Sequence, residues 1–254
     1  MIGDFSRGFG YAFAGLKSLR RPGIGRYVAL PLLVNLVMFA AGGWWLALSL
    51  GDLIAWVQGY LPQWLDWLAW LLWPLAVAGF LAVAWFGFTL LANLVGSPFN
   101  GLLAEKVARL EGKTPGPGRP LWQEVARAPV AEVRKLGYFA VLALPALVLF
   151  IVPVVNVAAP AVWLAVSAWM LAVEYADYPM GNEGMEATRQ RDVLRRRRGL
   201  ALGFGAGVLV MTLVPILNFL SMPAGVVGAT LLWTREIADD STAGASASGK
   251  MPAP

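Results

Sequence analysis

A short glycine-rich run that ends in arginine has the residue types needed to bind an anion. Its sequence is Pro22-Gly23-Ile24-Gly25-Arg26, and we expect a helix to begin here with Pro22 in its first turn. The first N–H groups of a helix lack intrahelical partners and carry a partial positive charge. Gly23 and Gly25 let an anion approach the backbone, and Arg26 adds a fork of donors. A glycine hinge followed by a snorkelling arginine explains the same residues, so both interpretations stay open.

Polar side chains inside apolar segments are a second set of candidates. Such groups usually face the protein interior or water, so we expect a polar path lined by Asn35, Asn93, Asn100, Asn156 and Asn218. Glu105 and Arg109 follow one apolar segment and join this set, with an ordinary surface ion pair as the alternative. The run Arg195–Arg198 is interpreted as an anchor to anionic lipid, with an anion-concentrating vestibule as the alternative.

The residue types that are absent exclude most enzyme chemistry. The sequence contains no Cys and no His, which removes thiolate chemistry, disulfides and the commonest general base and metal ligand. Gly112-Lys113-Thr114 resembles the end of a phosphate-binding loop, but Val107 stands where that loop requires its first glycine. We therefore expect no enzymatic activity, no cofactor and no bound metal. The basic residues are dispersed and no nucleic-acid-binding motif is present, so we expect no nucleic-acid partner.

The composition is typical of an integral membrane protein. Of 254 residues, 58% are hydrophobic and only 14% are charged, against about 25% charged in an average soluble domain. Four segments carry no charge: Tyr27–Gly51, Trp67–Ala104, Leu136–Val173 and Gly199–Thr234. About 20 residues of helix cross a bilayer, so we expect the first two segments to be full spans. The fold class is therefore an all-α membrane protein.

The third and fourth segments are too long for one span and short for two. Each is interrupted by proline and asparagine at matching places, Pro153 with Asn156 and Pro215 with Asn218, as in an internal repeat offset by 62 residues. All 20 Lys and Arg residues lie outside the segment 52–66, so the positive-inside rule places both ends of each hairpin on one side. We expect two partly inserted helical hairpins, with ordinary proline-kinked helices as the alternative. Paired interrupted segments of this kind point to a transport path.

The remaining parts of the chain are expected to flank one helical membrane domain over residues 1–236. An amphipathic helix in residues 1–21, with Phe5, Phe9 and Phe13 on one face, is expected at the membrane interface. Packing against the helical bundle is the alternative. Residues 105–135 form a helical segment on the cytoplasmic side, and residues 237–254 form a disordered tail. Gly203-x-Gly205-x-Gly207 lies in an apolar helix and indicates helix packing.

Several motifs in this order resemble the CysZ family of bacterial sulfate permeases. They are Pro22-Gly23-Ile24-Gly25-Arg26, Leu30-Pro31-Leu32-Leu33-Val34-Asn35, Ser97-Pro98-Phe99-Asn100, Leu103-Ala104-Glu105-Lys106-Val107, Asp177-Tyr178-Pro179-Met180, Val214-Pro215-Ile216-Leu217-Asn218 and Gly228-Ala229-Thr230-Leu231-Leu232-Trp233. The resemblance runs from about Phe5 to Glu236. It implies two full spans and two partly inserted hairpins, in agreement with the topology expected from charge and length.

The resemblance also implies a function and a site. It implies an inner-membrane, multi-pass protein in the lipid bilayer that supplies sulfate for cysteine biosynthesis, and a homo-oligomer. The family's sulfate motif is a Gly-Leu-Arg run, often with a second Arg, and it corresponds here to Gly23, Ile24 and Gly25, with Arg26 in the place of the second Arg. Gly25 departs from that motif and leaves one side-chain cation. A membrane scaffold or regulator that transports nothing is the alternative function.

Overall fold

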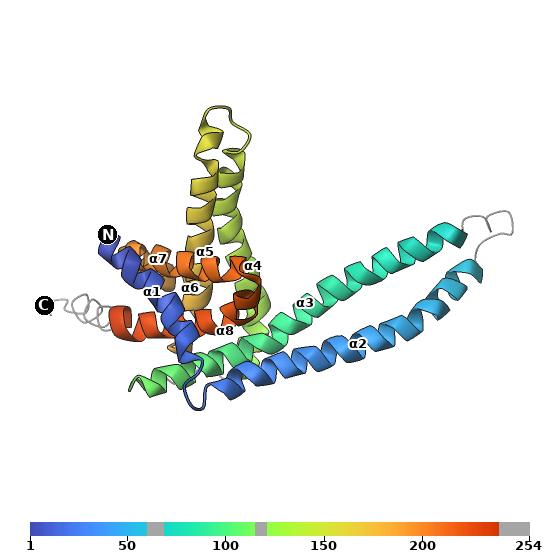
Figure 1. Ribbon diagram of the computed structural model, residues 1–254, viewed down its shortest axis with the longest axis horizontal. Helices are drawn as coiled ribbons and strands as arrows, with labels where there is room; N and C mark the ends of the chain where they lie inside the picture. The colour runs from blue at the N-terminus through green and yellow to red at the C-terminus, as the bar shows by residue number, and fades with distance from the viewer. Residues whose placement is uncertain (60–68, 115–120, 239–254) are drawn as a thin grey trace, which may run out of the picture. The chain divides into compact units, whose positions relative to one another are not determined.

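The computed structural model describes residues 1–59, 69–114 and 121–238 (Figure 1). All regular structure in these ranges is helical, and no strand occurs among them. The elements are α1 (Ile2–Ser18), α2 (Gly25–Gly59), α3 (Ala69–Leu110), α4 (Leu121–Val148), the 3-10 turn η2 (Val155–Val157), α5 (Ala159–Asn182), α6 (Ala187–Arg196), α7 (Arg198–Leu213), α8 (Pro215–Leu232) and the π-helix η3 (Trp233–Ile237). The all-helical fold class predicted from composition is confirmed at this level.

The chain divides into two compact units. The smaller consists of Arg26–Phe99, and the larger combines Met1–Gly25 with Asn100–Pro254. The single membrane domain expected over residues 1–236 thus comprises two compact parts, and its common placement in a membrane stays a prediction. Most of the tail expected over residues 237–254 lies outside the described residues, but Ile237 is helical.

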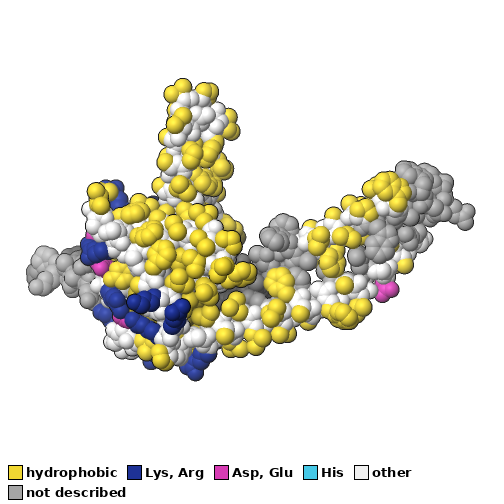
Figure 2. Space-filling model, viewed as in Figure 1, with side chains coloured by type: hydrophobic (Ala, Val, Ile, Leu, Met, Phe, Trp, Pro, Cys, Tyr) yellow, Lys and Arg dark blue, Asp and Glu magenta, His cyan; other side chains and the backbone are white. Residues whose placement is uncertain are grey.

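The smaller unit has the surface of a membrane-embedded helix pair. α2 contains 35 residues, which corresponds to about 52 Å of helix, more than the roughly 30 Å of a bilayer core. Its large apolar side chains are exposed along its length, and they include Leu30, Leu33, Leu36, Trp44, Trp45, Leu48 and Trp56 (Figure 2). Exposed apolar surface of this extent needs lipid or another protein to cover it.

By length and composition, three described helical segments could cross a membrane: Gly25–Trp56, Ala159–Asn182 and Pro215–Ile237. The first contains the predicted span Tyr27–Gly51. α3 contains most of the second predicted span, but the side chains of residues 84–98 lie outside the described part. The other two segments contain 24 and 23 residues, more than half of the predicted segments Leu136–Val173 and Gly199–Thr234. Both segments have this length because the helix continues beyond the charge-free stretch, past Glu174 in α5 and past Arg235 in η3.

The core of the larger unit is built from helices that approach one another through glycines. α1 packs on α7 and α8, and α5 packs on α7. A β-carbon added at Gly203 would collide with the carbonyl oxygen of Phe5, and one added at Gly205 would collide with that of Ala168. The interpretation of Gly203-x-Gly205-x-Gly207 as a helix-packing motif is therefore confirmed.

The face that α1 buries is its small-residue face. Gly8, Ala12, Gly15 and Ser18 are buried, whereas Phe5 remains 43% exposed. The helix therefore packs on the bundle and still presents an aromatic side chain on its surface.

The two helix pairs α4–α5 and α7–α8 are interrupted in different ways. The first bend covers residues 149–158 and contains Val154 with a positive φ of 72°. The second is the single extended residue Val214, after which Pro215 occupies the first turn of α8. The matched asparagines nevertheless make the same backbone bond. The N–H of Asn156 donates to the Val152 carbonyl at 3.0 Å, and that of Asn218 donates to the Val214 carbonyl at 2.8 Å.

The glycine packing generates a stability prediction. Gly205→Ala places a methyl group against the Ala168 backbone, so it should destabilise the folded protein by about 1–3 kcal/mol. Gly10→Ala is the matched control, because a β-carbon at Gly10 meets nothing within 4 Å and alanine is the better helix former. Thermal unfolding of the two variants in detergent measures the difference. An unfolding midpoint for Gly205→Ala equal to that of Gly10→Ala would contradict the packing argument.

Candidate functional site

The glycine-rich junction is a tight turn directly before α2. Gly23 has a φ of 82°, a left-handed conformation that glycine adopts without steric cost. The N–H of Ile24 donates to the Arg21 carbonyl at 3.2 Å, and the Ile24 side chain is fully buried. α2 begins at Gly25, so the expectation that Pro22 lies in its first turn is wrong. The left-handed Gly23 separates Pro22 from the helix.

Arg26 is the cationic side chain that the sequence predicts in this glycine-rich run, and Lys106 lies beside Gly23. Arg26 is exposed; its Nη2 donates to the Tyr27 hydroxyl at 3.2 Å, and its guanidinium lies 5.0 Å from the centre of the Tyr27 ring. A β-carbon at Gly23 would lie 3.6 Å from Cε of Lys106. The sequence does not predict that Lys106 lies beside Gly23, because 83 positions separate the two residues.

Glu111 joins this junction to the C-terminal end of the bundle. Its Oε1 accepts from Nη1 of Arg21 at 2.9 Å, and its Oε2 accepts from Nε of Arg235 and pairs with Nη2 of Arg235, both at 2.7 Å. Only 13% of the Glu111 side chain is exposed. The hydrogen bonds from Arg235 and Arg21 hold the pKa of Glu111 below its ordinary value, although burial acts in the opposite direction. Sequence reasoning missed this cluster because 124 positions separate Glu111 from Arg235.

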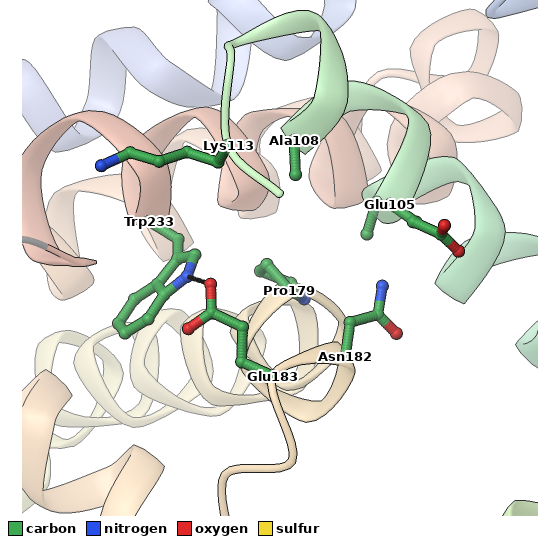
Figure 3. A pocket seen from close by; sticks show the side chains of 8 residues that line it. Glu105, Ala108, Lys113, Pro179, Asn182, Glu183 and Trp233 are labelled. Atoms are coloured by element: carbon green, nitrogen blue, oxygen red, sulfur yellow. Dashed lines mark hydrogen bonds between the residues drawn. The ribbon is translucent and has the colours of Figure 1, made fainter. Parts of the chain in front are cut away.

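Three residues of the predicted polar path lie in the last part of α3, and of these only Glu105 and Arg109 bond to each other. Asn100 is buried and donates from Nδ2 to the Tyr178 hydroxyl at 3.4 Å. Glu105 accepts from Arg109 at 2.7 Å, and both side chains are at least one-third exposed. Glu105 also lines a small cavity together with Glu183 and Trp233 (Figure 3). In the wall of this cavity, Nε1 of Trp233 donates to Oε1 of Glu183 at 2.7 Å. The cavity volume is ≈ 10 Å³, room for about one water, so it does not hold a tetrahedral oxyanion.

The other predicted path residues are not brought together. Asn156 and Asn218 are exposed, at two bends that lie well apart in the larger unit (Figure 1). Asn218 Oδ1 accepts from the Ser221 hydroxyl at 3.4 Å. Asn35 lies in α2 and Asn93 in α3, and their side chains lie outside the described part of the structure.

Comparison with known proteins assigns the chain to a family. Residues 11–223 match the family described as Sulfate transporter CysZ/Etoposide-induced protein 2.4. The chain belongs to this family. Within it, a protein named Sulfate transporter CysZ from Pectobacterium atrosepticum is 43% identical over 230 residues, which cover 89% of this chain and 84% of that protein. The family resemblance inferred from the ordered motifs is thus confirmed.

The Glu111 cluster generates a pH prediction. The folded pKa of Glu111 lies below the ordinary value of 4.5. Its carboxylate therefore stabilises the folded protein above pH 4.5, and that contribution is lost as the pH falls through the folded pKa. Between about pH 5 and 3, the unfolding midpoint of the wild type should fall more steeply than that of Glu111→Gln. Thermal unfolding in detergent at a series of pH values measures this, and parallel pH profiles would refute it.

Proposed function

We propose that this protein carries sulfate across the inner bacterial membrane and supplies it for cysteine biosynthesis. The observation that supports this most is the 43% identity to a protein named Sulfate transporter CysZ over 89% of this chain. Three helical segments long and apolar enough to cross a membrane fit a transporter of this kind.

The capture site in this proposal is the junction formed by Gly23, Ile24, Gly25 and Arg26. Sulfate at neutral pH is a dianion that accepts hydrogen bonds and has no proton to donate. The first N–H groups of α2 and the Arg26 guanidinium are donors only, and Lys106 beside Gly23 adds positive charge. Phosphate near pH 7 carries a proton, and leaving it unpaired in a desolvated site costs about 1–3 kcal/mol. A site made of donors alone therefore favours sulfate about tenfold or more.

The membrane placement in this proposal follows from where apolar side chains are exposed. At the bend of α4–α5, Val154 is 87% exposed, and at the bend of α7–α8, Ile216 is 80% exposed. Apolar bends such as these suit hairpins that insert part way into the bilayer, with α1 at the interface. Lys and Arg side chains gather on the part of the larger unit away from the tip of α4–α5 (Figure 2), where headgroups and water would solvate them.

The onward path in this proposal is lined by polar residues that lie in or next to the apolar segments of the sequence. Asn100, Glu105 and Arg109 follow the apolar part of α3, and Asn35, Asn93, Asn156 and Asn218 complete the set. Polar groups in apolar surroundings cost free energy unless they meet other polar groups or water, which supports a path role. A homo-oligomer would cover the exposed apolar faces that lipid does not.

The capture proposal predicts the behaviour of Arg26 variants. Vesicles that contain the purified protein should take up sulfate faster than empty vesicles. Arg26→Ala should raise the sulfate concentration for half-maximal uptake by about tenfold, because one charge-assisted contact is lost. Arg26→Glu should raise it further by reversing the charge. Unchanged sulfate uptake by Arg26→Ala, or equal competition by phosphate in the wild type, would place the capture site elsewhere.

The hairpin proposal predicts how deep each bend lies. Because the sequence contains no Cys, Val154→Cys and Ile216→Cys can each carry a single spin label. Both labels should collide with oxygen in the hydrocarbon and stay shielded from a water-soluble relaxation agent on either side of the bilayer. A label at Arg196→Cys, an exposed position of α6, is the control and should contact water. Free contact of either bend label with water would contradict partial insertion.

A further inference from the structure

We propose that Glu111 is a positioning residue for anion capture: it fixes Arg21, and through Arg21 it fixes the turn that ends at Gly25. This inference rests on the proposed function for its effect on sulfate. Its structural part, the immobilisation of the turn by Glu111, stands independently of that function.

The turn is held at Arg21 in two ways. The Arg21 guanidinium donates to Glu111 at 2.9 Å, and the Arg21 carbonyl accepts from the N–H of Ile24 at 3.2 Å. Between these two bonds lies Gly23 in its left-handed conformation. The side chain of Ile24 closes the turn by full burial. The position of the Arg21 side chain therefore determines where the following backbone lies.

The other end of the Glu111 bridge is itself anchored. Arg235 belongs to η3, a π-helix of five residues. In the same element, Trp233 donates to Glu183 at 2.7 Å. Glu236 accepts from Nη1 of Arg7 and from the Tyr11 hydroxyl, both at 3.1 Å. Glu111 thus ties the turn to an element that is bonded to α1 and to the end of α5.

The charge of Glu111 is needed for this bridge. Two guanidiniums lie within 2.9 Å of its two oxygens, and each needs a counter-charge to stay beside the other. A neutral amide leaves the two cations to repel each other, and the turn then samples several conformations. A ligand that binds only one conformation of the turn has an apparent affinity reduced by the fraction of molecules in that conformation. The maximal rate of transport is unaffected, because the path beyond the turn is unchanged.

The test compares variants in the vesicle uptake assay. Glu111→Gln should raise the half-saturating sulfate concentration about threefold to tenfold and leave the maximal flux per folded protein unchanged. Arg21→Gln should raise it in the same direction, and the double variant should be no worse than Glu111→Gln alone, because both single changes already break the Arg21–Glu111 bond that fixes the turn. Glu174→Gln is the matched control: it breaks the Lys135–Glu174 pair of 2.9 Å in the same unit and should leave half-saturation unchanged.

Three outcomes would overturn the proposal. They are tighter sulfate binding by Glu111→Gln, additive effects in the double variant, and a loss of maximal flux with unchanged half-saturation.

A spin label at Arg20→Cys, an exposed position of the turn, separates this inference from the proposed function. Its mobility should increase with Glu111→Gln and stay unchanged with Glu174→Gln. If the wild type carries no sulfate but the label responds, the proposed function is wrong and the positioning role stands. If the label does not respond, the positioning role is wrong.

Discussion

The larger unit depends on the direct contact of helix backbones at glycine positions. In α7, Gly203 faces the backbone of α1 and Gly205 faces that of α5. In α1, Gly8 and Gly15 face the backbones of α7 and α8 in the same way. Helices that approach this closely gain dispersion contacts along their whole length, and such packing replaces the hydrophobic driving force that lipid cannot supply. The π-helix, the bridge at Glu111 and the turn before α2 are all attached to these helices.

The distribution of charge complements this packing. The exposed apolar side chains lie along α2, along α4 and at both bends, whereas Glu111 follows the end of α3 and Glu236 lies in η3, each paired with arginine. Separation of this kind lets one surface meet hydrocarbon while the other stays hydrated. A dianion that leaves water loses strong hydration, so donors must be in place before it arrives. In the proposed capture of sulfate, a turn fixed by an ion-pair bridge and a buried isoleucine would meet that requirement better than a free loop.

The internal repeat has a structural counterpart at both ends of each helix pair. Lys135 pairs with Glu174 at 2.9 Å, and the matching residue Arg197 donates to the backbone carbonyl of Glu236 at 3.3 Å. At each bend, the N–H of the matched asparagine donates to the backbone carbonyl four residues earlier. Between these points the pairs differ, because α7 and α8 are packed within the bundle whereas the far end of α4–α5 extends from it (Figure 1). The two similar repeats therefore lie in different surroundings.

The sequence by itself determined the properties that depend on composition and order along the chain. Hydropathy determined the all-helical class, the glycine spacing determined where helices touch, and the ordered motifs determined the family. Pro153 and Pro215 marked the two bends, because proline disfavours continuation of a helix, whereas Pro31, Pro179 and Pro223 lie inside helices. The tertiary structure alone decided which distant side chains meet. Lys106 beside Gly23, and Glu111 between Arg21 and Arg235, are joined by helix packing across 83, 90 and 124 positions, and ionic contacts over such separations leave no local pattern in a single sequence.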